Sequence, residues 1–142
     1  MLVRGTRHCW HHQGVTSDIS ELLALQTWAL VGLSPNRSRH AWEVGAFLLS
    51  EGKRVVPVHP AAATVHGQPG YATLADIPFP VDVVDCFVRS DLVGAVVDEA
   101  IAVGAKGVWM QLGVVDQAAA SRAREAGLLV VMDRCPKIEW RE

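Results

Sequence analysis

The sequence lacks an apolar run long enough to cross a membrane. Its longest apolar stretches, such as residues 128–132, have the length of one strand and fall far short of the ~20 residues that a membrane span needs. The first residues include Arg4 and Arg7 but no hydrophobic segment typical of a secretory signal. We therefore expect a cytoplasmic protein that does not bind membranes.

The sequence also has few cysteines and a small net charge. The three cysteines, Cys9, Cys86 and Cys135, lie far apart, so they do not predict a disulfide framework and suit a reducing compartment. The formal net charge of −2 gives no general attraction to nucleic acid. Residues 26–62 hold four basic and two acidic side chains, which favours a small anionic ligand over a polyanion. Ordinary scatter of surface charge is the alternative explanation.

Apolar residues make up half of the 142, enough for the core of one domain. Residues 1–16 are polar and without periodicity, so we expect a flexible N-terminal arm there and one domain over residues 17–142. Four potential metal ligands lie in the arm: His8, Cys9, His11 and His12. A structural metal site takes its ligands from well-separated turns, so we predict no functional metal site in this cluster.

Apolar segments with the length of strands alternate with segments of helical periodicity. The predicted strands cover residues 28–34, 55–58, 81–88, 107–112 and 128–132, and the predicted helices cover residues 17–26, 40–51, 91–103 and 116–126. A helical turn is expected at residues 74–78, an irregular stretch at 59–68 and a short tail at 134–142. This alternation predicts a single α/β domain, a Rossmann-like, doubly wound fold with a five-stranded parallel sheet.

The first predicted strand-to-helix loop, residues 32–39, has the composition of a phosphate site. Its glycine lets the backbone turn closely, Ser34 and Ser38 offer hydroxyl donors, and the following helix would present free N–H groups to an anion. Arg37 or Arg39 could add a charge-assisted contact. A purely structural turn is the alternative, since Gly, Ser, Asn and Pro are common in such loops.

Two common phosphate-binding motifs are missing from this loop. It has neither the spaced glycines of a dinucleotide-binding fingerprint nor the Gly-Lys-Ser/Thr ending of a P-loop. The second predicted strand ends at His59-Pro60 rather than at the acidic residue that would hold a ribose hydroxyl. The usual modes of binding NAD and ATP are therefore disfavoured.

Short segments spread from Leu22 to Trp140 resemble a known family. They are Val31-Gly-Leu-Ser-Pro35, Ser38-Arg39, Val56-Pro-Val-His-Pro60, Tyr71-Ala-Thr-Leu-Ala-Asp-Ile-Pro78, Val81-Asp-Val-Val-Asp85, Phe87-Val-Arg89, Ala105-Lys-Gly-Val-Trp-Met-Gln-Leu-Gly113 and Met132-Asp-Arg-Cys-Pro-Lys-Ile-Glu139. In this order they resemble the small CoA-binding proteins related to the nucleotide-binding domain of the succinyl-CoA synthetase α subunit. No single motif decides the resemblance, but the series as a whole does.

The resemblance implies coenzyme A as the cofactor, with its pyrophosphate on the first loop, its adenosine at the second strand end and its pantetheine near the fourth. The implied cofactor-binding residues are Gly32, Leu33, Ser34, Arg37, Ser38, Arg39, His59, Pro60, Phe87, Val88, Arg89, Gln111, Leu112 and Gly113. The chain departs from the family at His59-Pro60-Ala61, where Asn-Pro and often a basic residue are usual. It departs again at His40-Ala41-Trp42, where Pro-Ser-aromatic is usual. The missing hydroxyl and positive charge imply weaker binding of the 3′-phosphate.

Catalytic motifs are absent from the sequence. No Gly-x-Ser-x-Gly elbow is present, and the chain has no room for the separate domain that carries the phosphohistidine of the synthetase relatives. We therefore predict a non-catalytic protein that binds CoA or acyl-CoA. Its role would be sensing, carrying or regulating an unidentified protein partner.

The alternative is a thiol or redox enzyme, or an exchanger of CoA disulfides, that uses Cys135. This cysteine follows the last predicted strand and could face the ligand, although a buried inert thiol is the other interpretation. Cys86 lies in an apolar strand and is predicted to belong to the core. Asp82 and Asp85 belong to the same predicted strand as Cys86, and we expect both side chains to face polar surroundings at the margin of the sheet.

Overall fold

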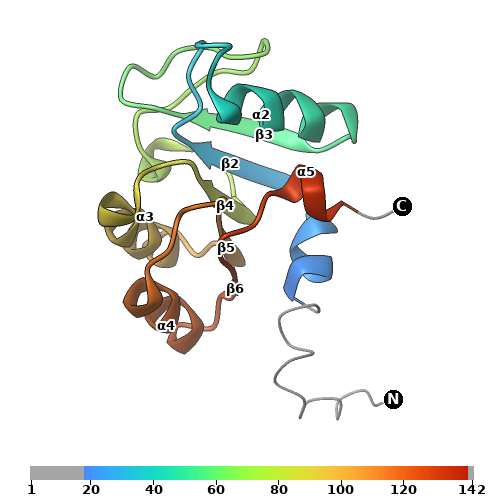
Figure 1. The fold of residues 1–142 in the computed structure, drawn as a ribbon. Coiled ribbons are helices and arrows are strands. Elements are labelled where there is room, and N and C mark those ends of the chain that lie inside the picture. The colour runs from blue at the N-terminus through green and yellow to red at the C-terminus, as the bar shows by residue number, and fades with distance from the viewer. Residues whose placement is uncertain (1–17, 141–142) are drawn as a thin grey trace.

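Five parallel strands form one sheet in the computed structural model, which describes residues 18–140 (Figure 1). The strands are β2 Thr27–Val31, β3 Arg54–Val58, β4 Val83–Cys86, β5 Gly107–Met110 and β6 Leu129–Val131. Their order across the sheet is β3-β2-β4-β5-β6, and every neighbouring pair is parallel. The predicted Rossmann-like α/β fold is confirmed, while the predicted arm, including its histidines and Cys9, lies outside the described residues.

Helices cover both faces of the sheet. They are α2 His40–Ser50, α3 Ser90–Ala102, α4 Gln117–Glu125 and α5 Pro136–Glu139, together with the short 3-10 turn η2 Leu74–Asp76 and a helix over residues 18–23. Helices α3 and α4 lie side by side on one face, whereas α2, α5 and the helix over residues 18–23 lie on the other (Figure 1). This arrangement is the doubly wound one, with a hydrophobic layer on each side of the strands.

The two core layers differ in the size of their side chains. Small residues of α3 and α4, such as Val97 and Ala123, pack on Val84 and Val108 of the sheet. On the other face the fully buried Trp28 and Trp109 lie with ring centroids 5.7 Å apart, under α2 and the helix over residues 18–23. Burying strands on both faces requires continuous apolar runs, which explains why the sequence pattern identified all five strands.

The ends of several elements differ from the predicted bounds. The first predicted strand reached residue 34, but β2 ends at Val31 because Gly32 turns the backbone into the left-handed region, with φ +105°. The predicted short tail contains α5, which begins at Pro136, a residue suited to the first turn of a helix. Asp18, in the helix over residues 18–23, accepts a hydrogen bond from the backbone N–H of Val130 on β6 at 3.4 Å.

The sheet order creates a switch point between β2 and β4. After β2 the chain crosses through α2 to β3 on one side, and it then returns to β4 on the other side of β2. Ligands in open parallel sheets bind outside the carboxyl ends of the strands at this kind of crevice. Within residues 18–140, no helix is long and apolar enough to cross a membrane.

Candidate functional site at the switch point

Two adjoining recesses open at the carboxyl ends of β2 and β4. They share Gly32, Arg39 and the segment 87–89, so both lie over the switch point. The larger recess, of about 720 Å³, extends toward β3 and reaches His59. The smaller, of about 280 Å³, extends toward β5 and reaches Gln111. Together they form one elongated site with a volume typical of small-molecule pockets.

Gly32 allows the β2 and β4 loops to approach each other closely. A Cβ atom at this position would lie 2.8 Å from the carbonyl oxygen of Phe87, and the residue has φ +105°. Its N–H donates to the carbonyl of Val58 at 2.8 Å, and the N–H of Phe87 donates to the carbonyl of Val31 at 2.9 Å. Only glycine satisfies both the positive φ and the contact with backbone, so the crevice depends on this residue.

Asn36 shapes the rest of the β2–α2 loop. Its side-chain oxygen accepts hydrogen bonds from the N–H of Ser38 at 3.0 Å and from the Ser38 hydroxyl at 2.6 Å. Its carbonyl accepts from the N–H of Arg39 at 3.2 Å. Asn36 also lines the larger recess. The sequence analysis did not select it, although Pro-Asn is a recognised turn signal.

Arg39 stands at the N-cap of α2, and no side chain caps this helix start. The first N–H groups of a helix are available to an anion when no side chain accepts them. Arg39 is exposed, lines both recesses and makes no ion pair with any residue between 18 and 140. The nearby Glu43 instead lies 3.8 Å from Nδ1 of His40. Arg39 therefore contributes an uncompensated positive charge to the site.

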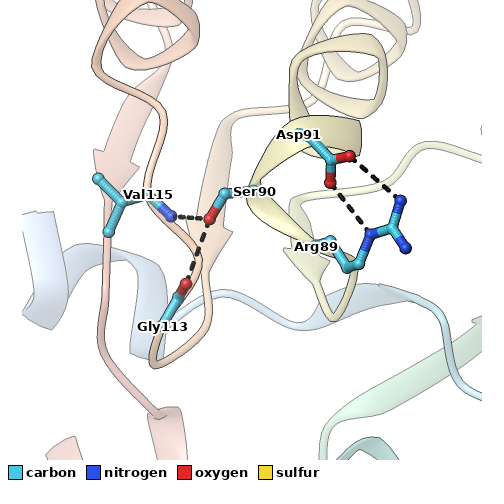
Figure 2. A network of polar contacts seen from close by, with 5 residues as sticks. All are labelled: Arg89, Ser90, Asp91, Gly113 and Val115. Carbon is cyan, nitrogen blue, oxygen red and sulfur yellow. Dashed lines mark hydrogen bonds and ion pairs between the residues drawn. The ribbon is translucent and has the colours of Figure 1, made fainter.

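The β4–α3 loop is held by a network of polar contacts (Figure 2). The Ser90 hydroxyl donates to the carbonyl of Gly113 at 3.2 Å and accepts from the N–H of Val115 at 2.9 Å. This joins the loop after β4 to the loop after β5. Arg89 donates to both carboxylate oxygens of Asp91 at 3.1 Å, and this contact lowers the pKa of Asp91. The charge of Arg89 is thus largely balanced.

The prediction that Asp85 lies at the polar margin of the sheet is wrong. It is fully buried in β4, and burial raises the pKa of its carboxyl group well above the ordinary value. Asp82 does lie at the margin, where its carboxylate accepts from the N–H of Thr27 and pairs with Lys106 at 3.5 Å. Asp85 is buried because it lies within β4 and both faces of this sheet are covered.

Gln111 is the partner of Asp85. Its Nε2 donates to Oδ1 of Asp85 at 2.8 Å, while Oδ2 of Asp85 and Oε1 of Gln111 have no partner among the described residues. A neutral carboxylic acid carries one O–H donor, and a carboxamide carbonyl is its complementary acceptor. The raised pKa of Asp85 favours its neutral form, which has an O–H donor at this pair. This pair fixes Gln111, which lines the smaller recess.

The structure brings most of the predicted cofactor-binding residues together. Those lining one or both recesses are Gly32, Ser34, Arg39, His59, Pro60, Phe87, Val88, Arg89, Gln111 and Leu112. Further lining residues, which were not predicted, are Val31, Asn36, His40, Ala41, Val58, Ala72, Thr73, Leu92, Val96, Glu99 and Val114. Those on α3 could not be found from strand ends, because they face the site only through the packing of that helix.

Four of the predicted residues do not line the recesses. Leu33 is fully buried in the core, so only its backbone is left for a ligand. The guanidinium of Arg37 lies over the ring of Trp42, 5.2 Å from its centroid. Ser38 donates to Asn36, and the N–H of Gly113 donates to Asp133 at 2.7 Å. These side chains and groups already have partners within the protein.

Cys135 follows β6 and contacts the site through His40, although it does not itself line either recess. Its Sγ is 3.4 Å from Nε2 of His40, a residue that lines the smaller recess. The segment before it is fixed to β5, because the carbonyl of Arg134 accepts from the indole N–H of Trp109 at 2.8 Å. Only 1% of Cys135 is exposed, and burial raises the pKa of its thiol. Cys86 is fully buried, as the apolar pattern predicted.

Sequence comparison identifies the family. The model of the CoA-binding domain family matches residues 26–141, nearly the whole described chain. The chain belongs to this family. The protein is also 32% identical to the uncharacterised protein YneT of Bacillus subtilis strain 168 over 123 residues, which cover 86% of this chain and 91% of that one. The resemblance found in the sequence is thereby confirmed.

Solved structures of the same fold extend this comparison. A hypothetical protein from Pyrococcus horikoshii OT3 is 41% identical, with a TM-score of 0.82 and coverage of 87% of both chains. The dinucleotide-forming acetyl-coenzyme A synthetase 1 of Candidatus Korarchaeum cryptofilum is 26% identical, with a TM-score of 0.71. The match covers 81% of this chain but 28% of the synthetase. A similar fold thus occurs both in a small protein and in part of a larger enzyme.

The site suits a phosphate-bearing ligand better than a metal ion. The close approach at Gly32, the uncapped start of α2 and the unpaired Arg39 all fit anionic oxygens. Within residues 18–140, no group of three or more His, Cys, Asp or Glu side chains is placed to hold a metal ion. The residues present therefore fit the phosphate groups of coenzyme A.

Proposed function

We propose that the protein binds coenzyme A or an acyl-CoA and that the loop from Gly32 to Arg39 holds the pyrophosphate. The observation that carries this proposal is the position of Arg39, which lines both recesses, has no ion pair in the described chain and stands at the uncapped start of α2. Backbone N–H groups and a guanidinium at the same place favour a ligand with several phosphate oxygens.

The polarity of the two recesses matches the remaining parts of coenzyme A, the adenosine and the pantetheine. The larger recess has both polar and apolar walls, with His59 and Pro60 on one side and Leu92 and Val96 of α3 on the other, and we assign it to the adenosine. The smaller recess, toward Gln111 and Leu112, is assigned to the pantetheine. An alternating apolar and polar groove is what this arm requires.

We propose that the protein binds its ligand without catalysing a reaction at the phosphate groups. Its role is then to sense or carry CoA, or to regulate a protein partner. In support, the larger recess contains Glu99 and His59 but no hydrogen bond or ion pair joins them in the described chain. His59 Nδ1 instead accepts from the N–H of Ala61 at 3.2 Å, a contact within its own turn. A general base oriented by a second side chain is thus missing from this recess.

Calorimetric titration of the full chain tests this proposal directly. We expect CoA to bind at least about tenfold more tightly than NAD, because the second strand end lacks the acidic residue that holds a ribose hydroxyl. Dephospho-CoA, titrated alongside, measures the contribution of the 3′-phosphate. NAD binding as tight as that of CoA, or no binding of CoA, would overturn the proposal.

A further inference from the structure

Cys135 and His40 are 95 residues apart in the sequence and meet beside the smaller recess. The Cys135 sulfur is 3.4 Å from Nε2 of His40, and the other ring nitrogen of His40 is 3.8 Å from the Glu43 carboxylate. Thiol, imidazole and carboxylate therefore lie in a row. The imidazole is close enough to take the thiol proton, as a base that activates a nucleophile must be, while the exposed carboxylate lies beyond hydrogen-bond distance and adds a weak charge interaction.

The sheet topology brings the far end of the proposed ligand toward this row. The carboxyl ends of β4, β5 and β6 lie in sequence, and neighbouring strands are about 5 Å apart, so β6 is about 10 Å from β4. With the pyrophosphate between β2 and β4, the pantetheine arm in the smaller recess runs toward His40 and Gln111. The arm ends in a thiol, and Cys135 follows β6.

We propose that Cys135 exchanges disulfides with coenzyme A and forms a mixed disulfide with it. The Cys135 thiol transfers its proton to His40, and the thiolate attacks one sulfur of CoA disulfide. A sulfur–sulfur bond forms between Cys135 and one CoA while the original disulfide bond breaks. The leaving CoA thiolate takes up the proton, so one disulfide replaces another and no external oxidant is needed. This step rests on the proposed binding of CoA.

The groups around Cys135 explain why the imidazole is needed. Burial raises the pKa of its thiol, whereas two backbone N–H groups and Lys137 on α5 lower it. The thiol is therefore protonated near neutral pH unless His40 on α2, backed by Glu43, accepts the proton. Cys86 has no such partner: its Sγ contacts the carbonyl of Val84 at 3.8 Å, and burial raises its pKa more strongly.

The test is intact-protein and peptide mass spectrometry after incubation of the full chain with CoA disulfide. A matched sample receives glutathione disulfide at equal concentration. We expect a reductant-sensitive adduct of CoA mass on the peptide that contains Cys135, formed at least about tenfold faster than the glutathione adduct because the bound nucleotide raises the local concentration of the disulfide. Peptide mapping separates this adduct from any on Cys9 or Cys86.

Variants at both residues of the pair define their roles, with a variant at Cys86 as the control. Cys135→Ser should lose the adduct, while Cys86→Ser should keep it. His40→Gln should slow adduct formation at least about tenfold at pH 7, because a positioned general base typically contributes about 100-fold or more, and higher pH should restore the rate. An unchanged rate in His40→Gln overturns its role as base. Equal rates of adduct formation with CoA disulfide and glutathione disulfide would overturn the proposal that the site binds CoA disulfide before the exchange.

Binding of reduced CoA to Cys135→Ser separates this inference from the proposed function. If reduced CoA binds the variant but the native chain forms no adduct at Cys135, the exchange fails while CoA binding stands. If reduced CoA binds neither the variant nor the native chain, the proposed function fails and the exchange fails with it. A melting curve for each variant verifies that the chain is folded, and Cys135→Ala replaces the serine variant if it is not.

Discussion

The loops after β2 and β4 are built alike, yet they carry different charge. Each follows a strand beside the switch point and ends on an arginine at the N-cap of a helix that lacks a side-chain cap. Arg89 forms two hydrogen bonds with Asp91, two residues away, whereas Arg39 has no carboxylate partner in the described chain. The same local geometry therefore gives one arginine that is free to bind an anion and one that is balanced within its own loop.

The largest effect is expected where the two loops touch. Gly32→Ala should abolish measurable CoA binding and destabilise the protein by roughly 1–3 kcal/mol, because the residue has φ +105° and the new Cβ would meet the carbonyl of Phe87 at 2.8 Å. Gly52→Ala is the matched control, with φ +85° and no atom within 4 Å of the new Cβ. Titration with CoA and urea denaturation of both variants separate the contact from the strain. Equal losses in the two variants would contradict the importance of the contact.

The difference between the two arginines gives the second prediction. Arg39→Ala should weaken CoA binding about 10- to 150-fold, the range for a lost charge-assisted contact of about 1.5–3 kcal/mol, with little change in melting temperature. Arg89→Ala should weaken it only a few-fold, because Asp91 already balances the charge. Asp91→Asn should then make Arg89 more important. Calorimetry at two salt concentrations measures these effects, and equal losses at both arginines would break the comparison.

The sequence predicted the fold well because the physical constraint was strong. A parallel strand covered on both faces is apolar along nearly its whole length, and the segments at β2, β4 and β6 meet this condition except at Thr27 and Asp85. Strand ends were less predictable, since the turn at Gly32 depends on its contact with the β4 loop. Helix α5 was missed because four residues give too little periodicity.

The site was predicted only where it follows strand ends. Phe87 directly follows β4, and Arg39 ends the loop after β2, so the order of strands beside the switch point places them near each other. The contact between His40 and Cys135 depends on the packing of α2 and α5 on one face of the sheet. The burial of Asp85 depends on an amide from the neighbouring strand. No local pattern encodes such contacts between distant segments.

The buried carboxyl group on β4 gives the third prediction, which concerns stability and pH. Because burial raises the pKa of Asp85 in the folded state, the folded protein holds a proton that the unfolded chain releases above its ordinary pKa of 3.8. Stability should therefore fall as pH rises from that value to the raised pKa, by at most about 1.4 kcal/mol per pH unit. Asp18, whose pKa is also raised by burial, adds to the slope in the same direction.

Asp85→Asn tests this assignment, since an amide can pair with Gln111 without a titrating proton. The variant should show a clearly flatter dependence of unfolding free energy on pH between about 4 and 8, measured by urea denaturation. Asp85→Leu leaves the Gln111 amide without its partner and should be destabilised at every pH. A slope in Asp85→Asn equal to that of the native chain would mean that Asp85 is ionised in the fold.

The smallest effect is expected at Arg37, which shares the β2–α2 loop with Arg39 but does not line either recess. Its guanidinium lies over the Trp42 ring, 5.2 Å from the centroid, an exposed cation–π contact of about 0.5–1 kcal/mol. Arg37→Ala should therefore leave CoA affinity within about twofold and lower stability by no more than that contact. The same calorimetric titration used for Arg39→Ala measures it. The two variants remove the same charge from one loop. If the arginines acted only by general electrostatic attraction, binding would therefore weaken equally in both variants. A loss at Arg39 alone would instead identify a direct contact with the ligand, and a loss in Arg37→Ala as large as in Arg39→Ala would contradict it.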